Sequence, residues 1–136
     1  MIPPLVHKQA LIRARVNKSP LADYDLDTSL RALIRLIDMN ILSGPHCAWC
    51  PMDGNVGWSG TAIIETSHIA FHSWCENGTI QLDVYSCKNF DINTVLGWLQ
   101  QFDPIEVDYK FLDRENGFEH IEDNRIDFKS INGIYI

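Results

Sequence analysis

Three short segments rich in β-forming residues lie close together in the chain, at residues 59–65, 69–74 and 79–86. The last two are separated by Asn77-Gly78, the dipeptide most typical of a tight β-hairpin. Strands joined by such a short turn pair antiparallel, because no room remains for a crossover connection. These segments therefore predict an antiparallel sheet at the centre of the fold.

Two further segments, residues 9–16 and 105–112, alternate apolar and polar side chains and are predicted as strands. Residues 44–57 are rich in Gly, Pro and Cys, so they are predicted as a long loop. The tail from Arg114 onward is polar, with a weak β tendency only near residues 131–136.

Two segments carry the apolar stripe of an amphipathic helix. The first is predicted to begin at a capping residue, Asp25 or Asp27, and to end near Met39. The second is predicted to run from the capping residue Asp91 to Gln101. The two stripes are Leu30, Leu33, Ile34 and Ile37 in the first helix, and Ile92, Val95, Leu96 and Leu99 in the second.

The order of these segments predicts an α+β fold, a two-layer α/β sandwich in which two main helices cover one face of an antiparallel sheet. The chain has 136 residues, of which 46% are hydrophobic, so it can form one domain with its own core. Residues 1–136 are therefore predicted as a single domain. The other face of the sheet is expected to need a cover, such as a second subunit.

The net charge of −7 comes from residues 67–136, where twelve acidic residues outnumber five basic ones, while residues 1–66 hold six of each. An acidic surface repels nucleic-acid phosphates and tolerates a cationic ligand, so no nucleic-acid partner is expected. No apolar run reaches the ~20 residues of a membrane span, and Met1–Leu5 lacks the features of a signal peptide. We therefore expect a cytoplasmic protein with no membrane partner.

The four cysteines are Cys47, Cys50, Cys75 and Cys87. In a reducing compartment they are expected to be free thiols. The first two form a Cys-x-x-Cys, but a zinc site would need a second pair at suitable spacing. A metal site built from Glu65, His68 and His72 is also disfavoured, because on a strand Glu65 would face away from both histidines. No metal is expected.

Residues 57–87 carry the side chains best suited to chemistry. They contain Gly57-Trp58-Ser59-Gly60, then Glu65-Thr66-Ser67-His68-Ile69-Ala70-Phe71-His72-Ser73-Trp74-Cys75-Glu76, then Asp83-Val84-Tyr85-Ser86-Cys87. Because side chains alternate along a strand, Ser67 and Phe71 are expected on one face and His72 on the other. Taken alone, Ser67 would be an ordinary strand serine.

This stretch resembles the processing region of bacterial and archaeal S-adenosylmethionine decarboxylases. That family has a Gly-x-Ser/Thr-Gly element, then Glu-Ser-His-Ile-x-x-His-Thr-Trp-Pro-Glu, then Asp-x-Phe-Thr-Cys-Gly. The spacings match without gaps from Gly57 to Cys87. The resemblance implies a small proenzyme that cleaves itself into residues 1–66 and 67–136, and a homodimer that covers the open sheet or completes the site.

The resemblance also implies a role for each matching position. Ser67 falls on the self-cleavage serine, so Thr66–Ser67 is the implied scissile bond. His72 falls on the processing histidine and Ser59 on the residue that assists it. The catalytic cysteine falls on Cys87.

Two further positions match substrate-binding residues of the family. Trp74 falls on the aromatic residue that stacks on adenine, and Glu76 on the acid that holds the ribose hydroxyls. The substrate implied by the resemblance is S-adenosylmethionine, and its decarboxylated product supplies the aminopropyl donor for spermidine biosynthesis.

The implied cofactor is a pyruvoyl group made from Ser67 itself. Its carbonyl would form a Schiff base with the substrate amine and act as the electron sink that ordinary side chains lack. In the implied self-cleavage, Ser67 Oγ attacks the carbonyl of Thr66 and His72 assists the elimination that follows. Cys87 would return a proton to the substrate carbon.

Among the positions that depart from the family pattern are Thr66, Cys75 and Asp53. Thr66 stands where the family has Glu, and Cys75 where it has Pro. Asp53 aligns with a second aromatic residue that stacks on adenine, a role that Trp49 or Trp58 could take over. The change at Asp53 motivates one alternative, a related pyruvoyl decarboxylase of a basic amino acid such as arginine or ornithine. The change at Thr66 motivates another, an unprocessed non-catalytic relative that binds or regulates a related enzyme.

Overall fold

The computed structural model describes residues 6–115 and 117–128. Within these residues, seven strands form one sheet in the order β2-β3-β4-β5-β1-β6-β7, and all neighbours pair antiparallel. The strands are β1 (Lys8–Val16), β2 (Ile41–Cys50), β3 (Gly57–Ile64), β4 (Ser67–Trp74), β5 (Thr79–Ser86), β6 (Pro104–Asp113) and β7 (Glu119–Asp127). The helices are α1 (Asp23–Leu36), α2 (Ile92–Trp98) and the 3₁₀ helix η1 (Leu99–Phe102).

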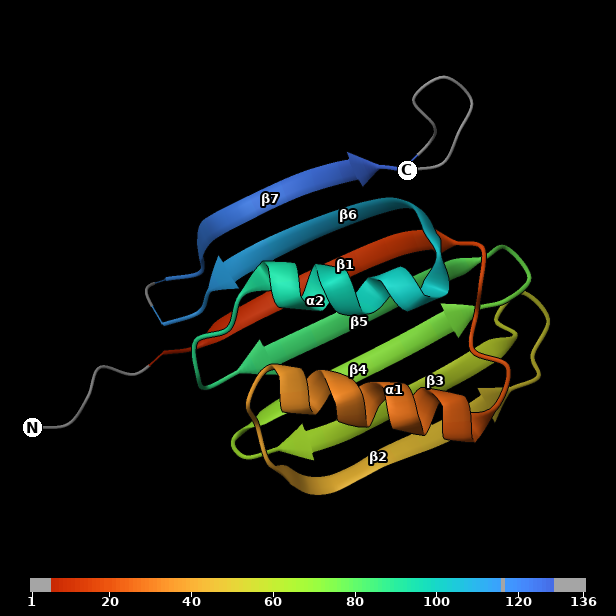
Figure 1. The fold of residues 1–136 in the computed structure, drawn as a ribbon, viewed down its shortest axis with the longest axis horizontal. Helices are drawn as coiled ribbons and strands as arrows, with labels where there is room; N and C mark the ends of the chain where they lie inside the picture. Colours follow the sequence, from red (N-terminus) through yellow and green to blue (C-terminus); the bar gives the residue numbers. More distant parts are fainter. Residues whose placement is uncertain (1–5, 116, 129–136) are drawn as a thin grey trace, which may run out of the picture.

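The helices α1 and α2 lie on the same face of the sheet (Figure 1). The predicted α+β class, a two-layer sandwich with both main helices on one side of an antiparallel sheet, is therefore confirmed. No helix in the described part of the chain is long and apolar enough to cross a membrane.

The core lies between the sheet and the two helices. In β1, Ala10, Ile12 and Ala14 are buried while the residues between them are exposed, as the alternating pattern predicts. Phe71 of β4 is fully buried, and its ring lies 5.5 Å from that of Phe102, measured between centroids. Burying large apolar side chains on this face leaves the opposite face of each strand free for polar residues.

The alternation predicted for β4 is also confirmed. Ser67, Ile69 and Phe71 are buried on the helix-covered face, whereas His72 is exposed on the other. Local periodicity therefore determines which side chains of the motif can meet within one chain.

The prediction of a loop at residues 44–57 is wrong, because β2 extends from Ile41 to Cys50. β2 is an edge strand, and such a strand tolerates Pro45, which has no backbone N–H to donate. Gly44, with a φ of +101°, and two register shifts let the backbone pass this Gly-Pro pair before it pairs again with β3. The composition of this segment misled the prediction, since backbone pairing with β3 outweighs it.

The predicted boundaries of the first helix need correction. α1 begins at Asp23, before either predicted cap, and its N-cap residue makes no side-chain hydrogen bond. Asp23 and Asp25 lie instead in the first turn, where their charges interact favourably with the helix dipole. The helix ends at Leu36, earlier than the predicted Met39.

The cap of the second helix was predicted correctly, whereas the strand in the tail was not predicted. Asp91 caps α2 as predicted, because its side chain accepts the backbone N–H of Asn93 at 2.9 Å. The tail, predicted only as polar, contains β7, which pairs with β6. Nearly all of its side chains are exposed, so the apolar alternation that identifies a half-buried strand is absent. The β tendency near 131–136 lies outside the described residues.

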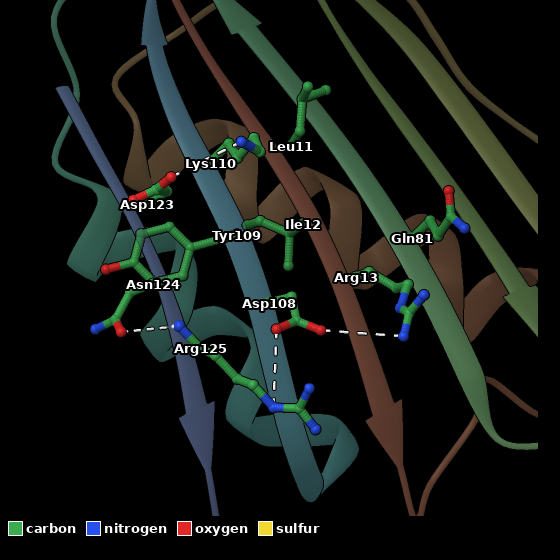
Figure 2. Close-up of a pocket in the computed structure, with 10 residues that line it drawn as sticks. All are labelled: Leu11, Ile12, Arg13, Gln81, Asp108, Tyr109, Lys110, Asp123, Asn124 and Arg125. Atoms are coloured by element: carbon green, nitrogen blue, oxygen red, sulfur yellow. Dashed lines mark hydrogen bonds and ion pairs between the residues drawn. The ribbon is translucent and has the colours of Figure 1, made fainter. Parts of the chain in front are cut away.

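The face opposite the helices carries a row of polar side chains that crosses the sheet. Directly paired positions place the following residues side by side on six strands: Ser59, His72, Gln81, Arg13, Asp108 and Arg125. Figure 2 shows Asp108 between two arginines, with its carboxylate oxygens 4.0 Å from Arg13 Nη2 and 3.9 Å from Arg125 Nε. A pocket of about 480 Å³ opens here over β1, β6 and β7. This polar, hollowed surface is called the open face below.

Candidate active site

The turn between β3 and β4 places Ser67 at the rim of the sheet. Ile64 and Ser67 are paired, so Glu65 and Thr66 alone form the turn. Thr66 is exposed, whereas the side chain of Ser67 points toward the core and the residue is only 5% exposed. The predicted scissile bond therefore joins an accessible turn residue to a buried serine.

Ser67 contacts Cys87, the residue that follows β5. The backbone N–H of Cys87 donates to Ser67 Oγ at 2.7 Å, which fixes the orientation of the serine side chain. Hydrogen bonds with two hydroxyls, the larger effect from Ser67 and the smaller from Thr66, lower the pKa of the Cys87 thiol from its ordinary value. Burial has the opposite effect. Two predicted catalytic residues, 20 positions apart in the chain, therefore lie together.

Ser59 and His72 form a second pair. They stand directly opposite each other on β3 and β4, and Ser59 Oγ lies 2.6 Å from His72 Nδ1. Both side chains lie on the open face, which is the face that Ser67 does not share. The predicted processing histidine and its predicted assistant are thus in direct contact.

The predicted substrate-binding residues Trp74 and Glu76 extend this second pair toward the loop at residues 51–56. The ring of Trp74 lies 6.2 Å from that of His72, and its Nε1 donates to Asn55 Oδ1 at 3.0 Å. Glu76 Oε1 accepts the backbone N–H groups of Gly54 at 3.2 Å and Val56 at 3.3 Å. These contacts hold the loop against the end of β4.

Trp58, the remaining predicted substrate-binding residue, lies apart from this group. It packs against the hydrophobic core, and its ring lies 5.4 Å from that of Trp49. Its neighbour Ser59 is on the open face, so alternation along β3 directs Trp58 to the helix-covered side.

The predicted site is consequently divided into two halves within one chain. Ser67 and His72 are five residues apart on the same strand, which corresponds to about 16 Å, and their side chains leave opposite faces. A proton transfer between these two residues requires heavy atoms within about 3 Å of each other. The His72 of this chain is therefore too far away to act on its own Ser67.

Sequence reasoning missed several residues that contact the predicted site. Asn55 holds Trp74, while Asn40 and Lys88 contact the turn residue Glu65. All three lie outside the strands, and none belongs to a motif with a known spacing. Only the folded chain brings them to the site.

The different surroundings of Cys47 and Cys87 predict different thiol reactivities. Burial, followed by the nearby charges of Asp27 and Asp23, raises the pKa of Cys47, whereas that of Cys87 is lowered. With increasing pH, we therefore expect iodoacetamide to modify Cys87 before Cys47, because a lower pKa means more thiolate. The His72→Ala chain, which we expect to remain one covalently continuous chain, suits this peptide-mapping measurement.

The matched control for this experiment is the same chain with Ser67→Ala added. Removing the hydroxyl removes the largest cause of the lowered pKa, so modification of Cys87 should shift to higher pH while that of Cys47 stays unchanged. Modification of both thiols at the same pH, or of Cys47 first, would contradict the described environment of Cys87.

A family model described as S-adenosylmethionine decarboxylase matches residues 14–115. This range includes both halves of the candidate site and every strand from β2 to β6.

Curated proteins with similar sequences carry a consistent name. An S-adenosylmethionine decarboxylase proenzyme of Clostridium botulinum strain Langeland is 32% identical over 82 residues, covering 57% of this chain and 67% of the relative. A protein of the same name from Picrophilus torridus is 37% identical over 76 residues, covering 52% of this chain and 55% of the relative.

A solved structure shares the fold. The adenosylmethionine decarboxylase from Aquifex aeolicus VF5 aligns with a TM-score of 0.64 at 19% identity, covering 88% of this chain and 98% of the other.

Proposed function

Because the chain belongs to the S-adenosylmethionine decarboxylase family, whose members are carboxy-lyases, we propose that it decarboxylates S-adenosylmethionine after cleaving itself between Thr66 and Ser67. The observation that carries this proposal is the contact between Ser67 and Cys87 at an accessible turn. It joins the nucleophile needed for self-cleavage to the thiol needed for catalysis.

Self-cleavage uses the serine and the peptide bond before it. Ser67 Oγ attacks the carbonyl carbon of Thr66, and the C–N bond breaks to give an ester and a free amine. Loss of the Ser67 Cα proton then expels the Thr66 carboxylate and leaves a double bond between Cα and Cβ. This group rearranges to an imine, and water releases ammonia from it to give the pyruvoyl group. The hydrogen bond from the Cys87 N–H holds Ser67 Oγ in place for the first step.

The base that removes the Cα proton comes from a second copy of the chain. The Ser67 side chain points toward the helices, but Thr66 before it is exposed at the rim of the sheet, so a partner can reach the backbone of this turn. His72 is exposed on the open face, but its own Ser67 is about 16 Å away. A homodimer formed through the two open faces can bring the Ser59–His72 pair of one protomer to the Thr66–Ser67 turn of the other.

The surroundings of Ser67 fit a pyruvoyl group, because the position is largely buried and adjoins an N–H donor and a thiol. A pyruvoyl group supplies a carbonyl that takes up the electron pair released when carbon dioxide leaves the substrate. Cys87 holds a proton at Sγ beside this position and delivers it to the substrate carbon. Its lowered pKa makes the thiol a better proton donor than an ordinary cysteine.

The substrate's nucleoside binds near the end of β4. Trp74 offers a partly exposed aromatic ring for adenine, and Glu76 offers carboxylate oxygens for the ribose hydroxyls. Aromatic rings near the site also favour the cationic sulfonium of the substrate. The product is an aminopropyl donor for spermidine biosynthesis.

The two fragments remain associated after cleavage. Residues 1–66 contribute β1, which lies between β5 and β6 of residues 67–136 and pairs with both. In addition, β3 of the first fragment pairs with β4 of the second. The sheet is thus interleaved, and separating the fragments would break backbone hydrogen bonds along three strand pairs.

The substrate assignment is tested by supplying the processed protein with carboxyl-labelled compounds. We expect labelled carbon dioxide from S-adenosylmethionine and none from arginine or ornithine. The Trp74→Ala variant should raise the KM for S-adenosylmethionine by roughly 10-fold, as expected when a stacking surface worth ~1–3 kcal/mol per base is removed. Release from arginine without release from S-adenosylmethionine would assign the chain to the basic amino acids instead.

A further inference from the structure

The turn before the candidate cleavage point has an unusual backbone conformation. Glu65 has a φ of 53°, in the left-handed region that residues with a Cβ atom rarely occupy. Such a conformation persists only where the surrounding contacts hold it. Glu65 is the residue before Thr66, so its backbone conformation helps to determine where Thr66 lies in the turn.

Two segments distant in the chain hold Glu65. Its backbone N–H donates to the carbonyl of Asn40 at 3.1 Å, and its carboxylate accepts the N–H of Asn40 at 3.0 Å. Lys88 Nζ contacts the same carboxylate at 3.4 Å and the carbonyl of Asp38 at 3.2 Å. The carboxylate therefore ties the turn to the loop before β2 and to the segment after β5.

The charges favour this arrangement. The hydrogen bond from the Asn40 backbone is the largest cause that lowers the pKa of Glu65, and Lys88 lowers it further against some desolvation. Glu65 is consequently ionised at neutral pH and forms an ion pair with Lys88.

Cys87 and Lys88 together hold the two residues that flank Thr66, whose carbonyl is attacked in the self-cleavage step. The N–H of Cys87 orients the nucleophile Ser67 Oγ, while the side chain of Lys88 fixes the residue before the electrophilic carbonyl. A shift of either group alters the approach of Oγ to the Thr66 carbonyl carbon. Small misplacements of reacting atoms lower reaction rates strongly.

We propose that Glu65 and Lys88 form a latch that holds the Thr66–Ser67 bond in the geometry needed for self-cleavage. This inference rests on the proposed function and adds two positioning residues, Glu65 and Lys88, to it. Because the ion pair is partly exposed, it contributes little to the stability of the folded chain. The latch therefore affects the rate of cleavage much more than it affects folding.

The test follows the conversion of freshly purified chain to two fragments by intact mass over time. We expect Lys88→Met and Glu65→Gln to slow cleavage by about 10- to 100-fold. Lys88→Arg, which keeps the charge, should restore most of the rate. The matched control is Arg31→Met, because Arg31 also pairs with a carboxylate, that of Asp27 at 2.6 Å, but lies on helix α1, away from the open face.

Two further measurements distinguish a positioning role of Glu65 and Lys88 from a role in stability. The melting temperatures of the unprocessed variants should stay close to that of the parent chain. Once processed, Lys88→Met should decarboxylate with the parent kcat per mature molecule, since the latch acts only before cleavage. Cleavage of both variants at the parent rate, or slowing only in proportion to lost stability, would overturn the latch alone. A parent chain that never cleaves would overturn the proposed function together with the latch.

Discussion

Replacing Ser67 with alanine should leave the chain as a single species of 15.6 kDa under conditions in which the parent chain divides into residues 1–66 and 67–136. The substitution removes the only atom that can attack the Thr66 carbonyl in the proposed mechanism, so we expect a complete loss of cleavage. Intact mass after a long incubation is the measurement. Without cleavage no pyruvoyl group forms, and decarboxylation of S-adenosylmethionine should disappear as well.

Ser73→Ala is the matched control for this variant. Ser73 is a buried serine on the same face of β4, where its hydroxyl bonds the backbone N–H and carbonyl of Trp58. Its removal should cost about 1 kcal/mol of stability and leave cleavage intact. A parent chain that persists as one species would instead favour a non-catalytic relative. Cleavage of the Ser67→Ala chain at the same bond would exclude Ser67 as the nucleophile.

Mixing two inactive chains should restore cleavage. We expect that neither the Ser67→Ala chain nor the His72→Ala chain cleaves alone, but that the His72→Ala chain cleaves when both are co-expressed. The reason is geometric, because Ser67 and His72 of one chain are about 16 Å apart on opposite faces of β4. In a dimer that contains one chain of each variant, the intact Ser67 of the His72→Ala chain meets the intact His72 of the Ser67→Ala chain.

The expected yield follows from the symmetry of the dimer. With random pairing of equal amounts, roughly half of the His72→Ala chains lie in mixed dimers, so about half should be cleaved. Tags of different mass distinguish the two chains. The control pairs the His72→Ala chain with a chain carrying both Ser67→Ala and His72→Ala, which should leave every chain intact.

Two results would contradict the shared site. If the His72→Ala chain cleaves alone at the parent rate, His72 is not the base. If mixed dimers form and no chain is cleaved, the base is not supplied by a partner. Either result would return the search for the base to residues of the same chain near Ser67.

Much of the fold follows from patterns that extend over only a few residues. Alternation predicted that Ser67 and His72 leave β4 on opposite faces, and Asp91 was predicted as the cap of α2. β2 was missed because its Gly-Pro composition is typical of loops, although pairing with β3 outweighs it. β7 was missed because its exposed side chains show no apolar alternation.

The candidate site was also predicted only in part from the sequence. The joint match of Ser59, Ser67, His72, Glu76 and Cys87, at the spacing of the family motif, was enough to identify a family resemblance. It did not show that Ser67 meets Cys87 and that Ser59 meets His72, in two separate pairs. Nor did it indicate Lys88, whose contact with Glu65 depends on where the segment after β5 passes the turn.

The sequence by itself determined the strand periodicity, the tight turns and the identity of the chemical groups, because these depend on neighbouring residues. Only the tertiary structure decided that β1 lies between β5 and β6, and that the site is split across two faces of one sheet. Such long-range pairings depend on burying apolar surface and satisfying backbone hydrogen bonds across the whole chain at once, which no local pattern encodes.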